Sequence, residues 1–185
     1  AQQQAWQTYG EVAAQWLARE PQRLDALLEV SYAQTNLGSL ALLRGRLDEA
    51  EQRFRASLEA KSQALQREPG RADLQGDVAN TISWLATVLT QSGQLQRARG
   101  VYEQGLVRIA AIRQARPDDL AWLKKQADMQ LRVAELELEL SQVDAARAHL
   151  QAARVGAQRL VKGDASNQTW LLGHLHTEAL AVSQD

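Results

Sequence analysis

Apolar residues recur along this chain at spacings of three and four positions, which indicate amphipathic helices rather than alternating strands. In one recurring pattern, a large apolar residue is followed by a small residue and, three positions on, by another apolar residue. It occurs as Leu37-Gly38-Leu40, Leu85-Ala86-Val88 and Val133-Ala134-Leu136. In another, a large residue stands one helical turn after a small one. Its members are Ala50 and Phe54, Ala98 and Tyr102, and Ala146 and Leu150, with Gln2 and Trp6 at the same phase. We predict that the second set faces a packed core, and that the first set belongs to amphipathic helices.

The whole pattern repeats every 48 residues. Pro21, Pro69 and Pro117 stand at that interval, and the turn Gly45-Arg46-Leu47 recurs as Gly93-Gln94-Leu95 and Ser141-Gln142-Val143. A fixed period of this length is the signature of a helical repeat array, in which each unit packs mainly on its neighbours. The chain is therefore predicted to be all-α, an α-solenoid of antiparallel helix pairs.

Each repeat holds a first helix before the turn and a second helix after it. We expect Asp48 and Asp144 to cap second helices, and proline to end them. The predicted helices cover residues 2–19, 23–44, 48–67, 71–92, 95–115, 119–141, 144–162 and 166–182. As domain organisation we expect one repeat domain over 1–185, with a half repeat at 1–20, full repeats at 21–68, 69–116 and 117–164, and a half repeat at 165–185. Because both ends fall in mid-repeat, we interpret the chain as a segment of a longer protein.

Composition narrows the possible partners. The chain has 45% hydrophobic and 23% charged residues, a formal net charge of -1 and no cysteine. Without a global positive field, nucleic acid is not an expected partner. No apolar run is long enough for membrane insertion. The lack of cysteine leaves the compartment open between cytoplasm and periplasm, with the cytoplasm preferred.

The residues Leu37-Gly38, Ala41 and Ala50-x-x-x-Phe54, repeated as Leu85-Ala86, Leu89 and Ala98-x-x-x-Tyr102, resemble the tetratricopeptide repeat family. That family repeat has about 34 residues, so each helix here would be longer by close to two turns. The chain looks like the elongated, tetratricopeptide-like unit of bacterial multidomain proteins, which are often linked to signalling modules. The resemblance implies a right-handed superhelix that binds partners on the concave wall formed by its first helices.

By matching positions, the resemblance places ten residues on that wall. They are Tyr32, Asn80, Asp128 and His176 in one column, Thr35, Ser83 and Leu131 one turn on, and Ser39, Thr87 and Glu135 after those. Co-chaperone members of the family clamp a peptide carboxylate with Lys and Asn, whereas Thr35 and Ser39 stand at the matching positions here. The alternative to peptide recognition is that these ten side chains merely form a solvated inner wall.

We find no constellation of nucleophile, base or metal ligands that would support catalysis, and we expect no enzyme activity, cofactor or metal. His174 and His176 are two positions apart on a predicted helix and face different directions, so we interpret them as a solvent-facing pair rather than zinc ligands. The alternating segment Glu135–Leu140 is predicted to be helical. Its carboxylates are expected on a solvated face, and Glu135 is a candidate for the groove.

The leading hypothesis is a non-catalytic scaffold that binds a protein or peptide on the first-helix wall. One alternative is an oligomerisation or spacer module that stacks through its ends, since residues 166–182 form an apolar surface that would favour self-association. A second alternative is a ligand-sensing regulatory domain of a bacterial signalling protein.

Overall fold

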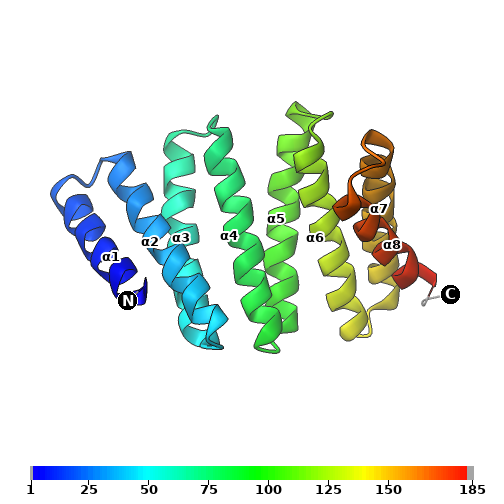
Figure 1. The fold of residues 1–185 in the computed structure, drawn as a ribbon, viewed down its shortest axis with the longest axis horizontal. Helices are drawn as coiled ribbons and strands as arrows, with labels where there is room; N and C mark the ends of the chain where they lie inside the picture. Colours follow the sequence, from blue (N-terminus) through cyan, green and yellow to red (C-terminus); the bar gives the residue numbers. More distant parts are fainter. Residues whose placement is uncertain (1, 183–185) are drawn as a thin grey trace. The chain divides into compact units, whose positions relative to one another are not determined.

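The computed structural model describes residues 2–182 and forms an all-α helical repeat solenoid (Figure 1). The eight helices of these residues are α1 (Gln2–Arg19), α2 (Leu24–Leu43), α3 (Leu47–Arg67), α4 (Ala72–Gln91), α5 (Leu95–Ala115), α6 (Leu120–Glu139), α7 (Val143–Gly163) and α8 (Gln168–Val182). The predicted helices are confirmed, with boundaries that agree to within about two residues. The alternating segment after Val133 continues α6 as a helix.

The predicted aspartate caps are wrong. Helices α3 and α7 begin at Leu47 and Val143, so Asp48 and Asp144 lie inside the first turn, and the flanking Arg46 and Gln142 make no side-chain capping bond. A side chain within the first turn can still favour the positive end of the helix dipole. A side-chain cap is instead found at α6, where Asp119 accepts hydrogen bonds from the backbone N–H groups of Ala121 and Trp122.

The chain divides into two compact units, residues 1–94 and 95–185. Unit 1 holds α1 to α4 and unit 2 holds α5 to α8. In repeat terms each unit consists of a second helix, a complete helix pair and a further first helix, and two repeats, or 96 residues, relate one unit to the other. Residues of unit 1 can therefore be compared position by position with those of unit 2.

Burial confirms most of the predicted core. Phe54, Tyr102 and Leu150 are buried, as are the small residues one turn before them, whereas Trp6 is only half-buried. In unit 1 a cluster formed by Leu27, Leu28, Ala60, Ala64 and Leu74 joins α2, α3 and α4. Small residues let paired helices approach closely, and at Gly156 of α7 an added Cβ would lie 2.9 Å from the Cβ of Ala127 on α6.

The turns within the helix pairs share one backbone conformation. Gly45 and Gly93 have φ of 68° and 72°, and Ser141 takes the equivalent place with φ of 59°. Glycine adopts this left-handed region freely, whereas a side chain makes it costly. The third turn therefore keeps the conformation of the other two although its sequence is less suited to it, which indicates that helix packing imposes it.

Replacing Ser141 removes this local cost. We expect Ser141→Gly to stabilise the chain by about 0.5–1 kcal/mol, because the left-handed penalty outweighs the added flexibility of the unfolded chain. Urea denaturation followed by circular dichroism measures the change. The reverse substitution, Gly45→Ser, serves as the matched control and should lower the unfolding free energy by about 1 kcal/mol. Equal stability of Ser141→Gly and wild type would contradict the strain.

Candidate binding face of the first helices

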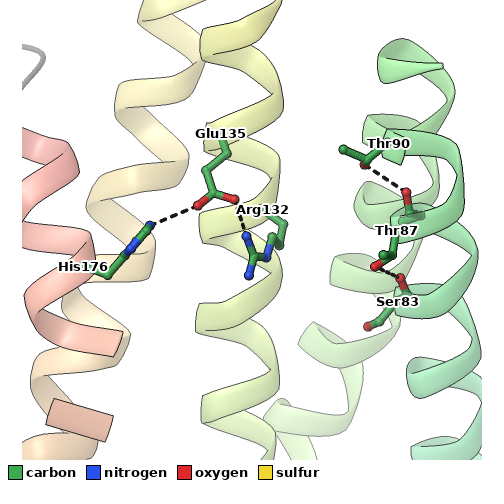
Figure 2. Close-up of polar contacts among 7 residues, drawn as sticks. Ser83, Thr87, Thr90, Arg132, Glu135 and His176 are labelled. Carbon is green, nitrogen blue, oxygen red and sulfur yellow. Dashed lines mark hydrogen bonds and ion pairs between the residues drawn. The ribbon is translucent and has the colours of Figure 1, made fainter. Parts of the chain in front are cut away.

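In unit 2 the first helices α6 and α8 are linked through Glu135. Its carboxylate accepts from Arg132 Nη1 at 2.7 Å, and its other oxygen lies 3.1 Å from His176 Nε2 (Figure 2). Arg132 and His176 are more than half exposed, whereas Glu135 is partly buried between them. Two predicted wall residues from different helices, Glu135 and His176, are thus brought together on one surface. We call this surface, formed by the outward side chains of α6 and α8, the first-helix face of unit 2.

Two further predicted residues, Asp128 and Leu131, line a cleft beside that face. The cleft has a water-accessible volume of about 40 Å³, is open to solvent, and lies among α6, α7 and α8. Its floor comes from α7 and includes Ala153 and Ala157, while Trp170 and Thr177 line it from α8. At its edge Lys124 Nζ lies 2.5 Å from Asp128 Oδ2, in an exposed ion pair.

The matching region of unit 1 contains a buried lysine. Lys61 of α3 is only 3% exposed, and its Nζ donates to Thr35 Oγ1 at 3.0 Å and to Thr81 Oγ1 at 2.9 Å. The same Nζ lies 5.7 Å from the ring centroid of Tyr32. Thr35 is also 2.7 Å from Ser57 Oγ. Tyr32 and Thr35, both predicted as wall residues, therefore belong to a network that holds an ammonium group between α2 and α4.

Burial shapes the ionisation of this network. It lowers the pKa of Lys61, and the attraction of the Asp77 carboxylate opposes that shift in part. The pKa of Tyr32 is raised, first by burial and then by the charge of Asp77 and the hydrogen bond that the phenol donates to it. Both shifts follow from the cost of charge in a poorly hydrated site. The Asp77 carboxylate thus contributes to the pKa shifts of both Lys61 and Tyr32.

The hydroxyl groups of Ser39, Ser83 and Thr87 are engaged within their own helices. Each donates to the carbonyl oxygen four residues earlier: Thr35, Ala79 and Ser83, respectively. Figure 2 shows two such bonds on α4, those of Thr87 and Thr90. All three predicted residues are half-buried, whereas Asn80 is exposed. Hydroxyls bonded in this way can still accept a hydrogen bond from a partner.

Two predictions about titratable side chains need correction. Glu137 does not lie on a solvated face: it is 2% exposed, and its Oε2 is 2.8 Å from His149 Nδ1 of α7. The histidines do face different directions, but His174 is largely buried and lies 3.7 Å from Glu178, whereas His176 is exposed beside Glu135. Within residues 2–182, no three His, Asp or Glu side chains gather closely enough to hold a metal ion.

Sequence reasoning missed Lys61, Asp77 and Thr81. A signal was present, because the equivalent positions at steps of 48 residues hold the buried Ala13, Ile109 and Ala157. A charged residue in an otherwise small or apolar column is surrounded by protein on several sides and must find polar partners there. Glu137 offers a similar signal, since its equivalent positions hold the buried apolar residues Ala41 and Leu89.

Comparisons with known proteins bear on the fold alone. No family model matches the chain, and no curated protein matches it. Among solved structures, BtubC (BKLC) from P. vanneervenii aligns with a TM-score of 0.58 at 20% identity over 86% of this chain. The aligned region spans 57% of the BtubC chain. A structure described as the DHF119 filament covers 100% of this chain and 93% of its own, at 12% identity and a TM-score of 0.43. In the described residues, no helix combines the length and apolarity that crossing a membrane requires.

The Lys61 network predicts an asymmetric response to substitution. Thr81→Val should lower the unfolding free energy by about 1.5–3 kcal/mol, because the buried ammonium loses an acceptor. Lys61→Met should change it by less than about 1 kcal/mol, since the buried charge is removed with its partners left hydrogen-bonded elsewhere. Thr90→Val, which loses only a bond within α4, is the matched control. If Thr81→Val and Thr90→Val lower the unfolding free energy equally, the hydrogen bond from Lys61 to Thr81 does not contribute as predicted.

The titration of Lys61 gives the unfolding free energy a pH dependence of definite sign. Because the pKa of Lys61 is lower in the folded chain, the unfolded chain binds more protons between that pKa and the ordinary lysine value of about 10.4. Stability should therefore rise with pH in this window, and Lys61→Met should lose the rise. Urea midpoints measured from neutral pH upwards test this rise. The series stops just below the tyrosine titration range, because there the raised pKa of Tyr32 makes stability fall with pH. Parallel curves for wild type and variant would show that Lys61 titrates normally.

Proposed function

We propose that this chain is a non-catalytic, tetratricopeptide-like scaffold that binds a peptide segment of a partner protein on its first-helix face. The observation that carries the proposal is the linked set of charged side chains on α6 and α8. Arg132, Glu135 and His176 stand on neighbouring first helices beside an open cleft. Such a surface offers donors, acceptors and an apolar recess within reach of one extended peptide.

The energetics of the face favour exchange of partners. Exposed ion pairs such as that of Lys124 with Asp128 contribute little to stability, so replacing them with contacts to a peptide costs little. The helices that present them are already ordered by the core, which removes one source of entropy loss on binding. Charged groups arranged in this way also favour specificity and a fast approach of the partner over raw affinity.

A selection experiment tests the proposal without a known partner. Short random peptides displayed on phage are selected against the 185-residue chain, and enriched peptides are then measured by fluorescence anisotropy. The combined variant Arg132→Ala, Glu135→Ala, His176→Ala should weaken binding by about tenfold or more, since several charge-assisted contacts are lost together.

The control removes a comparable ion pair elsewhere. Asp144 and Arg147 form an exposed pair on α7, 3.8 Å apart, away from the face of α6 and α8. The combined variant Asp144→Ala, Arg147→Ala should leave peptide binding unchanged. The proposal would be refuted if peptides bound the Arg132, Glu135 and His176 variant as tightly as wild type but bound the Asp144 and Arg147 variant more weakly. That result would place binding on the second helices.

A second candidate function, self-association, is favoured by the apolar surface of α8. Leu171, Leu172 and Leu175 are 41%, 67% and 54% exposed. Their counterparts one repeat earlier include Leu123 and Ala127, which are buried on α6, with α7 packed against Ala127. We propose as occupant the α1 helix of a second copy. It has the phase of a second helix and carries the exposed Tyr9 and Val12. Such pairing would be head-to-tail and would extend the array.

Light scattering across a concentration series tests self-association. The wild-type chain should increase in mean mass with concentration, and the combined variant Leu172→Lys, Leu175→Lys should stay monomeric because a charge cannot be buried in the new interface. Val107→Lys, at a residue of α5 that is 72% exposed, is the control and should behave as wild type. A wild-type chain that remains monomeric at the highest concentration rejects this candidate.

A further inference from the structure

The open cleft of unit 2 and the buried lysine network of unit 1 occupy the same position in the repeat. Counting back 96 residues from the cleft, Ala157 corresponds to Lys61 and Gly173 corresponds to Asp77. In unit 1 these two longer side chains occupy the space among α2, α3 and α4. In unit 2 a methyl group and a hydrogen atom replace them, and the space among α6, α7 and α8 is open. The cleft of unit 2 is therefore equivalent to the space that the alkylammonium side chain of Lys61 fills in unit 1.

Part of the polar environment of that group is retained in unit 2. Thr177 is the counterpart of Thr81 and is 2% exposed. Thr81 donates to the carbonyl oxygen of Asp77 and accepts from Lys61. Thr177 likewise donates within its helix, at 2.7 Å to the carbonyl oxygen of His174, and it lines the cleft. A hydroxyl oxygen has two acceptor lone pairs, so the acceptor that Lys61 uses in unit 1 is available in unit 2.

The remaining substitutions suit a cation with an aliphatic stem. Asp128 replaces Tyr32 and supplies a carboxylate at the cleft edge, where Lys124 now pairs with it. Leu131 replaces Thr35 and adds an apolar wall, while Ala153 and Ala157 form an apolar floor. Trp170 lines the cleft from α8 and offers an aromatic surface, which attracts cations when they lie over the ring.

We propose that the cleft among α6, α7 and α8 binds an alkylammonium group, namely a lysine side chain of the partner segment. The stem lies against Leu131, Ala157 and Trp170, and the ammonium donates to Asp128 and Thr177 while Lys124 is displaced towards solvent. This inference rests on the proposed binding function of the first-helix face and names the side chain that the face selects.

A small probe tests the site without any partner protein. Nα-acetyl-lysine N-methylamide is titrated into the 185-residue chain carrying ¹³C-labelled alanine methyl groups, and the methyl signals are followed by NMR. The probe should shift the signals of Ala153 and Ala157 saturably. Nα-acetyl-norleucine N-methylamide has the same aliphatic stem without the ammonium and should bind at least about tenfold more weakly, since it lacks the charge-assisted bonds.

Variants separate the cleft from a general effect of charge. Ala157→Lys restores the unit 1 residue and should abolish the shift of Ala153, whereas Val155→Lys, an exposed change on the same helix, should not. Thr177→Val should weaken binding of the lysine probe by about tenfold. Thr177→Ser, which keeps the hydroxyl, should bind the probe with wild-type affinity. The threonine pair keeps the test decisive if Ala157→Lys does not fold.

Three results would overturn the proposal: no saturable shift, equal binding of the norleucine probe, or binding that Ala157→Lys leaves intact. The selected peptides distinguish this inference from the proposed function. Peptides that lose affinity with the Arg132, Glu135 and His176 variant yet tolerate Ala157→Lys would support the binding face and reject the lysine site. The opposite outcome is also distinguishable. If the lysine probe binds but no selected peptide loses affinity with the Arg132, Glu135 and His176 variant, the lysine site is supported and the binding face is rejected.

Discussion

Close approach of a second helix to its paired first helix is the constraint on which the rest of this fold depends. It requires a small residue at the contact, which Gly38 supplies between α2 and α3, and Ala127 and Gly156 supply between α6 and α7. Once the two axes are held at that distance, large residues such as Phe54 and Leu150 fill the space one turn away. The backbone must then turn within the same few residues in every repeat. Even Ser141 adopts the left-handed conformation that this turn demands.

The same constraint makes the space among three consecutive helices a fixed volume that side chains either fill or leave open. In unit 1 a long side chain, Lys61, fills it, and hydroxyl groups on both flanking first helices satisfy the buried ammonium. In unit 2 an alanine leaves it open. Packed interiors tolerate neither unpaired charge nor empty space without cost, and the residues around this space also differ between the two units. Tyr32 accompanies the lysine, and Asp128 accompanies the cleft.

Much of the fold could be predicted from the sequence because periodicity reports on packing directly. The 48-residue step located all eight helices of the described residues and most of the core columns. The capping aspartates were wrong because a favourable residue near a helix start does not determine which residue flanks it. Glu137 was misplaced for a different reason: the pattern of its own helix suggested a solvated side, and only the packing of α7 brings His149 against it. Handedness and the wall of first helices were implied by resemblance and remain predictions.

The candidate site was less accessible to sequence reasoning, since it depends on contacts between helices that are far apart in the chain. Glu135 and His176 were matched to the wall by register, and the structure joins them. Lys61 escaped notice because its own repeat gives no sign that the position is buried; only comparison with Ile109 and Ala157 does. A residue's neighbours in the column thus carry information that its neighbours in the sequence lack. Columns, rather than motifs, are where an unusual side chain stands out.

The equivalence of Lys61 and Ala157 has a consequence for how such arrays diversify. In most folds a new pocket requires a remodelled loop or a shifted element. Here one difference on a second helix, Lys61 against Ala157, and three on the flanking first helices distinguish the filled interior of unit 1 from the open recess of unit 2. After a repeat is duplicated, each copy can drift independently at that position while the backbone stays the same. A duplicated array of this kind can acquire new binding specificities by changing side chains at equivalent positions of its repeats, while the backbone that presents them stays the same.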